Sequence, residues 1–131
     1  RIAAVGPGVD AKRIGERVSL LDIAPTVLAL LNFNYVSRFF GQDILNEGRT
    51  HQRAVMANYQ TVGYYEHGML VELRPQRRVH VIDAASGREL PPSDETRHFT
   101  NEAIGYYQGA STAFRTGALR MPGHLLPRPV N

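Results

Sequence analysis

Residues 18–31 read VSLLDIAPTVLALL, a run dominated by large apolar side chains. A helix that is apolar on most sides is typically buried, so we expect a buried helix over residues 22–31. Two residues can cap its start. With Asp22 as the N-cap, Pro25 falls in the first turn, where its missing N–H does no harm; with Ser19 as the N-cap, Asp22 takes the capping-box position.

The middle of the chain has a different pattern, in which short strand-like segments alternate with turn residues. Four strands are predicted, over residues 53–58, 61–65, 69–73 and 79–83. Glu66-His67-Gly68 and Pro75-Gln76-Arg77 suit the connections between strands. The pattern therefore predicts an antiparallel meander, with a bulge expected at Gly63.

A long helix is predicted over residues 94–115. Ser93 offers an N-cap, and Asp94 and Glu95 would stabilise the first turn through the helix dipole. Apolar residues recur along one face of this helix: Phe99, Ala103, Tyr106, Tyr107, Ala110 and Phe114. We expect this stripe to cover one face of the meander, because both elements need a partner for their apolar surfaces.

The remaining segments are less regular. Residues 2–5 form an apolar run before Gly6-Pro7-Gly8, which predicts a strand end followed by a turn. Residues 32–48 are a loop rich in aromatic side chains, and the chain beyond Gly117 is expected to be irregular. The two patterns divide the chain into residues 1–50, with a last strand, helix and loop, and residues 51–131, with the sheet, the long helix and the tail.

The composition is that of a folded globular chain. Of 131 residues, 43% are apolar and 21% are charged, and the formal net charge is +3. The lack of cysteine excludes disulfides, cysteine-ligated zinc, iron–sulfur clusters and thiol nucleophiles. No segment reaches the roughly 20 apolar residues of a membrane span.

The basic residues are almost all arginines. Their one cluster consists of Arg74, Arg77 and Arg78, and we interpret it as a solvated turn rather than a patch that binds nucleic acid or another anion.

Three segments carry a resemblance to a known family. Residues 18–28, VSLLDIAPTVL, are similar to the pattern S-x-x-D-hydrophobic-x-P-T-hydrophobic-L found towards the C-terminal end of sulfatase-like catalytic domains in the alkaline-phosphatase superfamily. Residues 37–45, SRFFGQDIL, and 58–65, NYQTVGYY, resemble the branch that contains lipoteichoic-acid synthases and phosphoglycerol transferases. The resemblance extends from about residue 9 to residue 81.

This resemblance implies an α/β fold. The chain, as an isolated α+β fragment, would be the end of an alkaline-phosphatase-like domain, followed by the meander and the long helix. The family's chemistry is attack on a phosphate or sulfate ester by a metal-bound Thr, Ser or modified Cys. A divalent metal ion lowers the pKa of such a nucleophile and neutralises the charge of the transferred group, and its usual ligands are Asp, Glu and His.

The family's catalytic residues have no counterpart in this sequence. In the family the nucleophile lies well upstream, and the last metal ligands are an Asp-His pair before the S-x-x-D helix. The chain contains no Asp-His dipeptide, and Asp10 and Glu16 are its only acidic residues before Asp22. We therefore assign no catalytic, cofactor-binding or metal-ligating residue, and we interpret Asp22, Pro25 and Thr26 as residues that start a helix.

Other candidate sites carry weaker signals. The spacing of the histidines, at positions 51, 67, 80, 98 and 124, indicates no metal motif, and we expect ordinary surface or half-buried roles for them. None of the serines at positions 19, 37, 86, 93 and 111 lies in a Gly-x-Ser-x-Gly elbow. Tyr59, Tyr64 and Tyr65 could stack on a sugar or a nucleobase, but we interpret them as packing against a helix.

The sequence thus predicts a C-terminal fragment of a sulfatase-family, metal-dependent phosphate or sulfate ester hydrolase, or of a phosphoglycerol transferase, that acts on envelope glycans or lipids. The fragment would be structural, inactive alone and without a cofactor of its own. Its partner would be the N-terminal catalytic portion of the same polypeptide, on the periplasmic or extracytoplasmic side of the membrane. Exposed apolar surface would favour self-association, and no nucleic acid is expected. The alternative is an independent basic module that binds anionic glycans or lipid headgroups.

Overall fold

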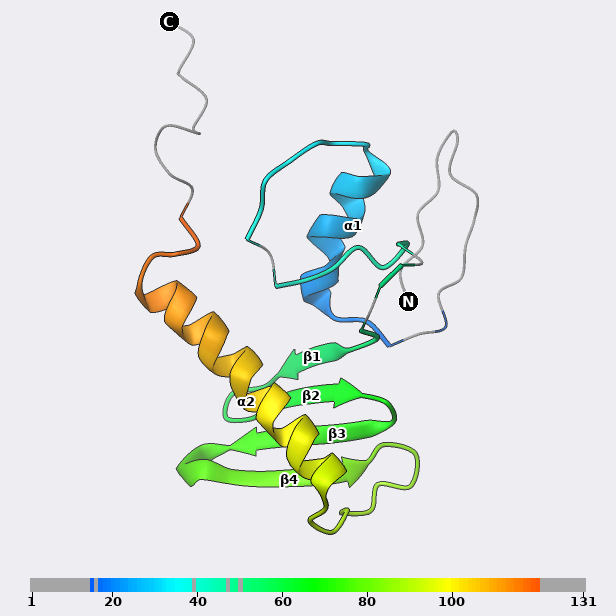
Figure 1. Ribbon diagram of the computed structural model, residues 1–131, viewed down its shortest axis with the longest axis vertical. Coiled ribbons are helices and arrows are strands. Elements are labelled where there is room, and N and C mark those ends of the chain that lie inside the picture. Colours follow the sequence, from blue (N-terminus) through cyan, green and yellow to red (C-terminus); the bar gives the residue numbers. More distant parts are fainter. Residues whose placement is uncertain (1–14, 16, 39, 47, 50, 121–131) are drawn as a thin grey trace, which may run out of the picture.

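The computed structural model describes residues 15, 17–38, 40–46, 48–49 and 51–120 (Figure 1). A 3-10 helix, η1 (Leu20–Asp22), runs directly into the α-helix α1 (Ile23–Leu30). After a long loop come the strands and the second α-helix: β1 (Ala54–Ala57), β2 (Val62–Glu66), β3 (Met69–Arg74), the 3-10 helix η2 (Pro75–Arg77), β4 (Arg78–Asp83) and α2 (Asp94–Arg115). The strand predicted at residues 2–5 and the tail from residue 121 onward lie outside the described residues.

The four strands form an antiparallel meander in the order β1-β2-β3-β4, as predicted. Val55, Tyr64, Val71 and Val81 stand opposite one another in successive strands, so they make one row across the sheet. Together with the helices, this purely antiparallel sheet gives the α+β arrangement that was expected for the isolated chain.

Two glycines shape β2 and the turn after it. His67 and Gly68 form the two-residue β2–β3 turn with φ of 47° and 82°, the left-handed conformation that matches the twist of a hairpin. The bulge expected at Gly63 is wrong, because Gly63 lies in regular register between Met56 and Glu72. A Cβ at Gly63 would lie 2.8 Å from Met56 Cγ, so glycine makes room for the methionine side chain without interrupting the ladder.

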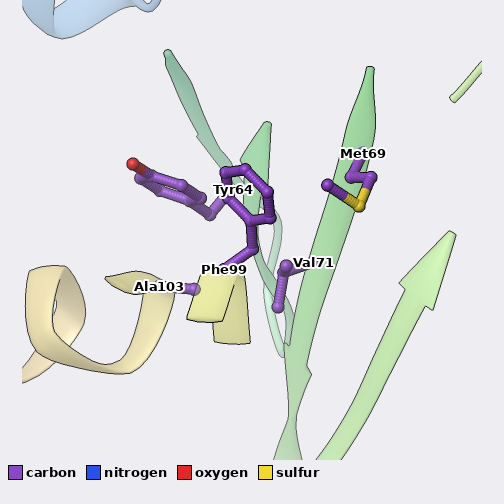
Figure 2. Close-up of a cluster of buried hydrophobic side chains, with 5 residues drawn as sticks. All are labelled: Tyr64, Met69, Val71, Phe99 and Ala103. Carbon is purple, nitrogen blue, oxygen red and sulfur yellow. The ribbon is translucent and has the colours of Figure 1, made fainter. Parts of the chain in front are cut away.

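Helix α2 crosses one face of the sheet and closes the core (Figure 1). Ser93 fixes its start as predicted: Ser93 Oγ accepts a hydrogen bond from Thr96 N at 3.1 Å, and Thr96 Oγ1 accepts one from Ser93 N at 2.8 Å. Val71, which is 1% exposed, lies at the centre of the core. Figure 2 shows the buried cluster that the sheet and α2 form together, which consists of Tyr64, Met69, Val71, Phe99 and Ala103.

The apolar stripe of α2 is covered only over its first turns. Phe99 and Ala103 are buried and Tyr106 packs at the margin of the core, whereas Tyr107 and Phe114 are 52% and 78% exposed. The expectation that the stripe is covered as far as Phe114 is therefore wrong. A helix of this length spans about 33 Å, whereas four strands at about 4.8 Å spacing cover less than 20 Å. The C-terminal turns of α2 consequently extend past the sheet (Figure 1).

Helix α1 lies where it was predicted, but it is not buried on most sides. Of its residues only Pro25 and Thr26 are buried, while Ile23 and Val27 are 39% and 46% exposed. The sheet and α2 cover one another, so within residues 15–120 as described α1 finds a partner for one face only. The prediction of a helix buried on most sides is therefore wrong for the described part of the chain, because hydropathy alone does not show which elements pack against a helix. Neither α1 nor α2 is long and apolar enough to cross a membrane, and the same holds for every other helix in the described part of the chain.

Candidate functional site: a helix–loop junction and an arginine-lined pocket

The start of the first helical segment is held by a buried carboxylate. Asp22, which is 2% exposed, accepts a hydrogen bond from Ser19 N through Oδ2 at 2.8 Å and another from Gln42 N through Oδ1 at 2.9 Å. Ser19 is the N-cap and Asp22 occupies the capping-box position, so the second of the two predicted capping schemes is the one adopted. The Asp22 carboxylate therefore both caps the helical segment and holds the loop that returns to it.

Thr26 extends the same contact by one turn. Its Oγ1 donates to the Asp22 carbonyl at 2.6 Å and accepts from Ile44 N at 3.1 Å. Gly41 lies so close to η1 that a Cβ would stand 1.9 Å from the Leu21 carbonyl oxygen, so only glycine fits. We call this contact the helix–loop junction; it consists of Ser19, Asp22, Thr26, Gly41, Gln42 and Ile44.

The helix–loop junction is tied to the sheet and to α2. Ser19 Oγ donates to the Val55 carbonyl in β1 at 2.8 Å. The Phe40 carbonyl accepts from Arg53 Nη2 at 2.8 Å and from the Tyr106 hydroxyl at 2.5 Å. Since Arg53 precedes β1 and Tyr106 belongs to α2, the loop before Gly41 is fixed to both elements of the second half.

A second polar cluster surrounds Glu66 at the end of β2. Glu66 is 2% exposed, and its Oε2 accepts from the Tyr64 hydroxyl at 2.7 Å. Its Oε1 lies 3.0 Å from His51 Nδ1 and 3.9 Å from His67 Nδ1. An ionised carboxylate can only accept hydrogen bonds, so Nδ1 of His51 carries a proton. The cluster is a buried anion surrounded by donors.

These contacts set the ionisation of both buried groups. Burial alone would raise the pKa of Glu66, but the hydrogen bonds from Tyr64 and His51 outweigh burial and hold this pKa below its ordinary value of 4.5. Burial also raises the pKa of the Tyr64 phenol, and the hydrogen bond to Glu66 raises it further. Tyr64 therefore remains a protonated donor and Glu66 an ionised acceptor at neutral pH.

The lowered pKa of Glu66 predicts a pH-dependent stability. A carboxyl whose pKa is lower in the folded state stabilises the fold fully above its unfolded-state pKa, near 4.5, and this contribution is lost as the pH falls through the folded-state value. Glu66→Gln should therefore lower the free energy of unfolding at pH 7 and flatten its decline below pH 4.5. Urea unfolding from pH 7 to pH 3 measures both. Glu95→Gln, on the exposed first turn of α2, is the charge-matched control, and an unchanged acid slope in Glu66→Gln would contradict the prediction.

An open pocket of about 360 Å³ lies beside this cluster, lined by Arg17, Arg49, Gln52, Tyr65 and His67. The Arg17 guanidinium carbon lies 4.3 Å from the centroid of the Tyr65 ring, a cation–π distance. The pocket therefore joins three parts of the chain: the segment before η1, the loop before β1, and the end of β2 with its turn.

The structure places the other candidate residues as follows. His80 lies 3.0 Å from Glu89 and His98 lies 3.4 Å from Glu102, both as partly exposed pairs, and His124 lies outside the described residues.

Tyr64 packs under α2 as predicted. Tyr65 instead lies under Arg17, and Tyr59 is 97% exposed, so the packing interpretation is wrong for these two. Arg74, Arg77 and Arg78 are exposed, as a solvated turn requires.

Sequence reasoning missed the convergence of His51 and His67 on Glu66. The available signal was strand alternation, because Glu66 shares a strand face with Val62 and Tyr64 and a charged residue there must find partners. The identity of those partners depends on the path of the loop before β1, which periodicity does not encode. In the part of the chain that the structure describes, no three His, Asp or Glu side chains gather closely enough to hold a metal ion.

Comparisons with known proteins agree with this architecture at the level of the fold. No family model and no curated protein matches the sequence. Among solved structures, the chain is similar to a protein in the alkaline phosphatase superfamily from Vibrio parahaemolyticus, with 25% sequence identity and a TM-score of 0.61. The match covers 77% of this chain and 25% of that chain. The chain is thus a structural neighbour of the alkaline phosphatase superfamily, and it corresponds to about a quarter of the length of that protein.

Proposed function

We propose that the chain is the C-terminal part of a sulfatase-like, metal-dependent enzyme that hydrolyses or transfers phosphate or sulfate esters. Within that enzyme it would act as a structural support without the catalytic centre. The observation that carries the proposal is the helix–loop junction. Residues 18–28 and 37–45, two of the segments that resemble the sulfatase-like family, meet there through Asp22, Thr26 and Gly41.

The third resembling segment belongs to the same unit. Residues 58–65 include most of β2, which pairs with β1, and β1 accepts the hydrogen bond from Ser19. All three segments are thus linked through direct contacts. Such linkage supports a common origin for the three matches, because segments that resemble a family by chance have no reason to pack on one another.

The exposed apolar surface around α1 supports the proposed partner. Leu20 is 84% exposed and Leu31 60%, and the loop after α1 exposes Phe33 and Val36 at 59% and 80%. Large apolar side chains are costly to leave in water, and a group of them exposed within one segment favours an interface. In our proposal the rest of the catalytic α/β domain covers it, as the N-terminal portion of the same polypeptide. The similarity to only a quarter of a superfamily member is in line with such a missing portion.

The chemistry then belongs to the upstream portion. There, a divalent metal ion would activate a Thr, Ser or modified Cys nucleophile and neutralise the charge of the transferred group. Phosphoglycerol groups on an envelope polymer, outside the cytoplasmic membrane, are the substrate that the resemblance of residues 37–45 and 58–65 favours. A sulfatase proper is the nearest alternative for the parent enzyme.

A comparison of two polypeptides tests the proposal. The chain alone should show neither turnover of p-nitrophenyl phosphate or p-nitrophenyl sulfate nor stoichiometric binding of Mn²⁺ or Zn²⁺ in calorimetry, because a catalytic ligand set is proposed to lie upstream. A polypeptide extended by the upstream coding sequence should gain both activities. Metal-dependent turnover by the chain alone would refute the proposal. So would an initiating methionine immediately before Arg1, which would favour an independent binding module.

A further inference from the structure

Strand β4 lies at an outer edge of the sheet, and part of this edge is open (Figure 1). The later half is covered, because Leu90 N donates to the Val81 carbonyl at 2.8 Å and Asp83 N donates to the Arg88 carbonyl at 2.9 Å. Backbone groups alternate in direction along a strand, so Val79 also points its N–H and C=O away from β3. Within the part of the chain that the structure describes, neither group of Val79 has a hydrogen-bond partner. An edge of this kind is a template for another extended chain.

Two prolines end the cover of this edge. Residues 88–90 run antiparallel to β4, with Glu89 opposite Ile82. Pro91 and Pro92 follow directly, and proline has no N–H to donate, so the ladder cannot continue through them. The positions opposite the first half of β4 are therefore left for a strand from elsewhere.

A groove of about 560 Å³ lies beside the open edge, between β4, the loop that follows it and the first turns of α2. Its apolar lining consists of Val79, Val81, Leu90, Pro91 and Pro92. A side chain that enters this groove from an added strand would lose its contact with water. The groove therefore favours an apolar residue opposite Val79.

Polar side chains on the rim of the groove already have partners. Arg97 Nη1 lies 3.1 Å from Asp94 Oδ1, and Glu89 Oε1 lies 3.0 Å from His80 Nδ1. Thr100 Oγ1 donates to a carbonyl of its own helix at 2.7 Å. The unpaired donor and acceptor that we identify beside the groove belong to the backbone of Val79, and the backbone of an extended peptide matches both.

Arg78 indicates which charge an added strand should carry. Arg74 stands directly opposite Arg78 in β3, so two positive charges face one another on the side of the sheet away from α2. Glu72 lies 2.6 Å from Arg74, whereas Arg78 Nε donates only a long bond, of 3.5 Å, to the Pro75 carbonyl. A carboxylate opposite Arg78 on its open side would balance its charge. A second copy of β4 would bring further arginine to this edge, which disfavours pairing between two copies.

We propose that the open part of β4 binds an extended acidic peptide as a fifth strand, antiparallel to β4. One peptide residue exchanges two hydrogen bonds with Val79 and places an apolar side chain in the groove. The next residue is acidic and lies opposite Arg78. Main-chain bonds thus supply attraction, and the groove and Arg78 supply selectivity. This inference stands apart from the proposed function, because it requires neither a catalytic centre nor an upstream portion.

Titration of the full chain with the peptide acetyl-Thr-Thr-Leu-Glu-Thr-amide, observed by ¹H–¹⁵N NMR, tests the proposal. We expect saturable shifts centred on Val79, Val81 and the other residues that line the groove. The same peptide with N-methyl-leucine should not bind measurably, because it loses the N–H that donates to Val79 and its methyl group blocks the edge. A peptide with serine in place of leucine should bind about tenfold more weakly, because it leaves the groove unfilled.

Val79→Pro tests the hydrogen bonds on the protein side. Its N–H points away from β3, so proline should leave the β3–β4 ladder intact, and thermal melting should show the variant folded. We expect binding to weaken about tenfold through the lost donor. Val79→Ala is the matched control, because it also shortens the side chain but keeps the N–H, and it should weaken binding less.

Arg78→Glu tests the charge. It should weaken binding of the glutamate peptide about fivefold and strengthen binding of a peptide with lysine in its place. Arg88→Glu, an equal charge change at the exposed position opposite Asp83, should alter neither affinity.

Four outcomes would overturn the proposal. The first two are no saturation by the leucine–glutamate peptide and equal binding of its N-methyl form. The third is a dimer in sedimentation that Val79→Pro dissociates, which would assign the edge to a second copy. The fourth is loss of peptide binding in a polypeptide extended by the upstream coding sequence, which would assign the edge to that portion.

Discussion

Gly41→Ala should unfold the helix–loop junction and lower the free energy of unfolding by about 3 kcal/mol or more. A Cβ at this position would lie 1.9 Å from the Leu21 carbonyl oxygen, 2.4 Å from its carbon and 2.9 Å from Asp22 N. All three are backbone atoms in the capped start of η1, so no side-chain rotation can relieve the overlap. The loop would have to move away, and with it the hydrogen bonds that Gln42 N and Ile44 N make to Asp22 and Thr26.

Urea unfolding of Gly41→Ala and of a matched variant, Gly105→Ala, measures the effect. A Cβ at Gly105 meets no atom within 4 Å, and its position on α2 is exposed and helical. Alanine there should raise the free energy of unfolding by about 0.5–1 kcal/mol through helix propensity. The same substitution should thus act in opposite directions at the two sites. A Gly41→Ala variant as stable as the wild type would show that the close approach of the loop to η1 is not a feature of the folded chain.

The second half of the fold was predictable because its signals are local. The position of α2 follows from the N-cap residue Ser93 and from the periodic apolar stripe that starts at Phe99. Both signals come from residues close together in the sequence. The hairpin at His67 and Gly68 follows equally from its own turn residues. Antiparallel strands joined by such turns pair with their neighbours in sequence, so the meander order needed no long-range information.

The misjudged features depend on contacts between distant parts of the chain. Hydropathy predicted that α1 is buried on most sides, but it could not indicate which elements pack against the helix, and only Pro25 and Thr26 are buried. The glycine at position 63 was assigned to a bulge because strand patterns do not show the cross-strand Met56 side chain. The Arg17–Tyr65 contact and the His51–Glu66 pair each depend on the path of a loop. The sequence of such a loop shows no periodicity from which its path could be predicted. Sequence therefore predicted the elements and the helix cap, but not the pocket.

The helix–loop junction is also what positions that pocket. Its Ser19 holds the segment that carries Arg17, and its Gln42 holds the loop that carries Arg49 and Gln52. A substitution that disrupts the junction should therefore disturb the pocket as well as the stability of the fold, although no junction residue lines the pocket.

Asp22→Ala should produce the second large effect, a loss of about 3 kcal/mol or more in the free energy of unfolding. Its carboxylate is 2% exposed and is the acceptor for Ser19 N and Gln42 N. Removing it leaves two backbone N–H groups without this partner, and each buried unsatisfied donor costs about 1–3 kcal/mol. Asp22→Asn, which keeps one acceptor oxygen, should lose about half as much. Asp94→Ala, an acidic residue on the exposed first turn of α2, should lose little, since its side chain is 99% exposed. Equal urea midpoints for Asp22→Ala and Asp94→Ala would show that the S-x-x-D carboxylate does not hold the junction together.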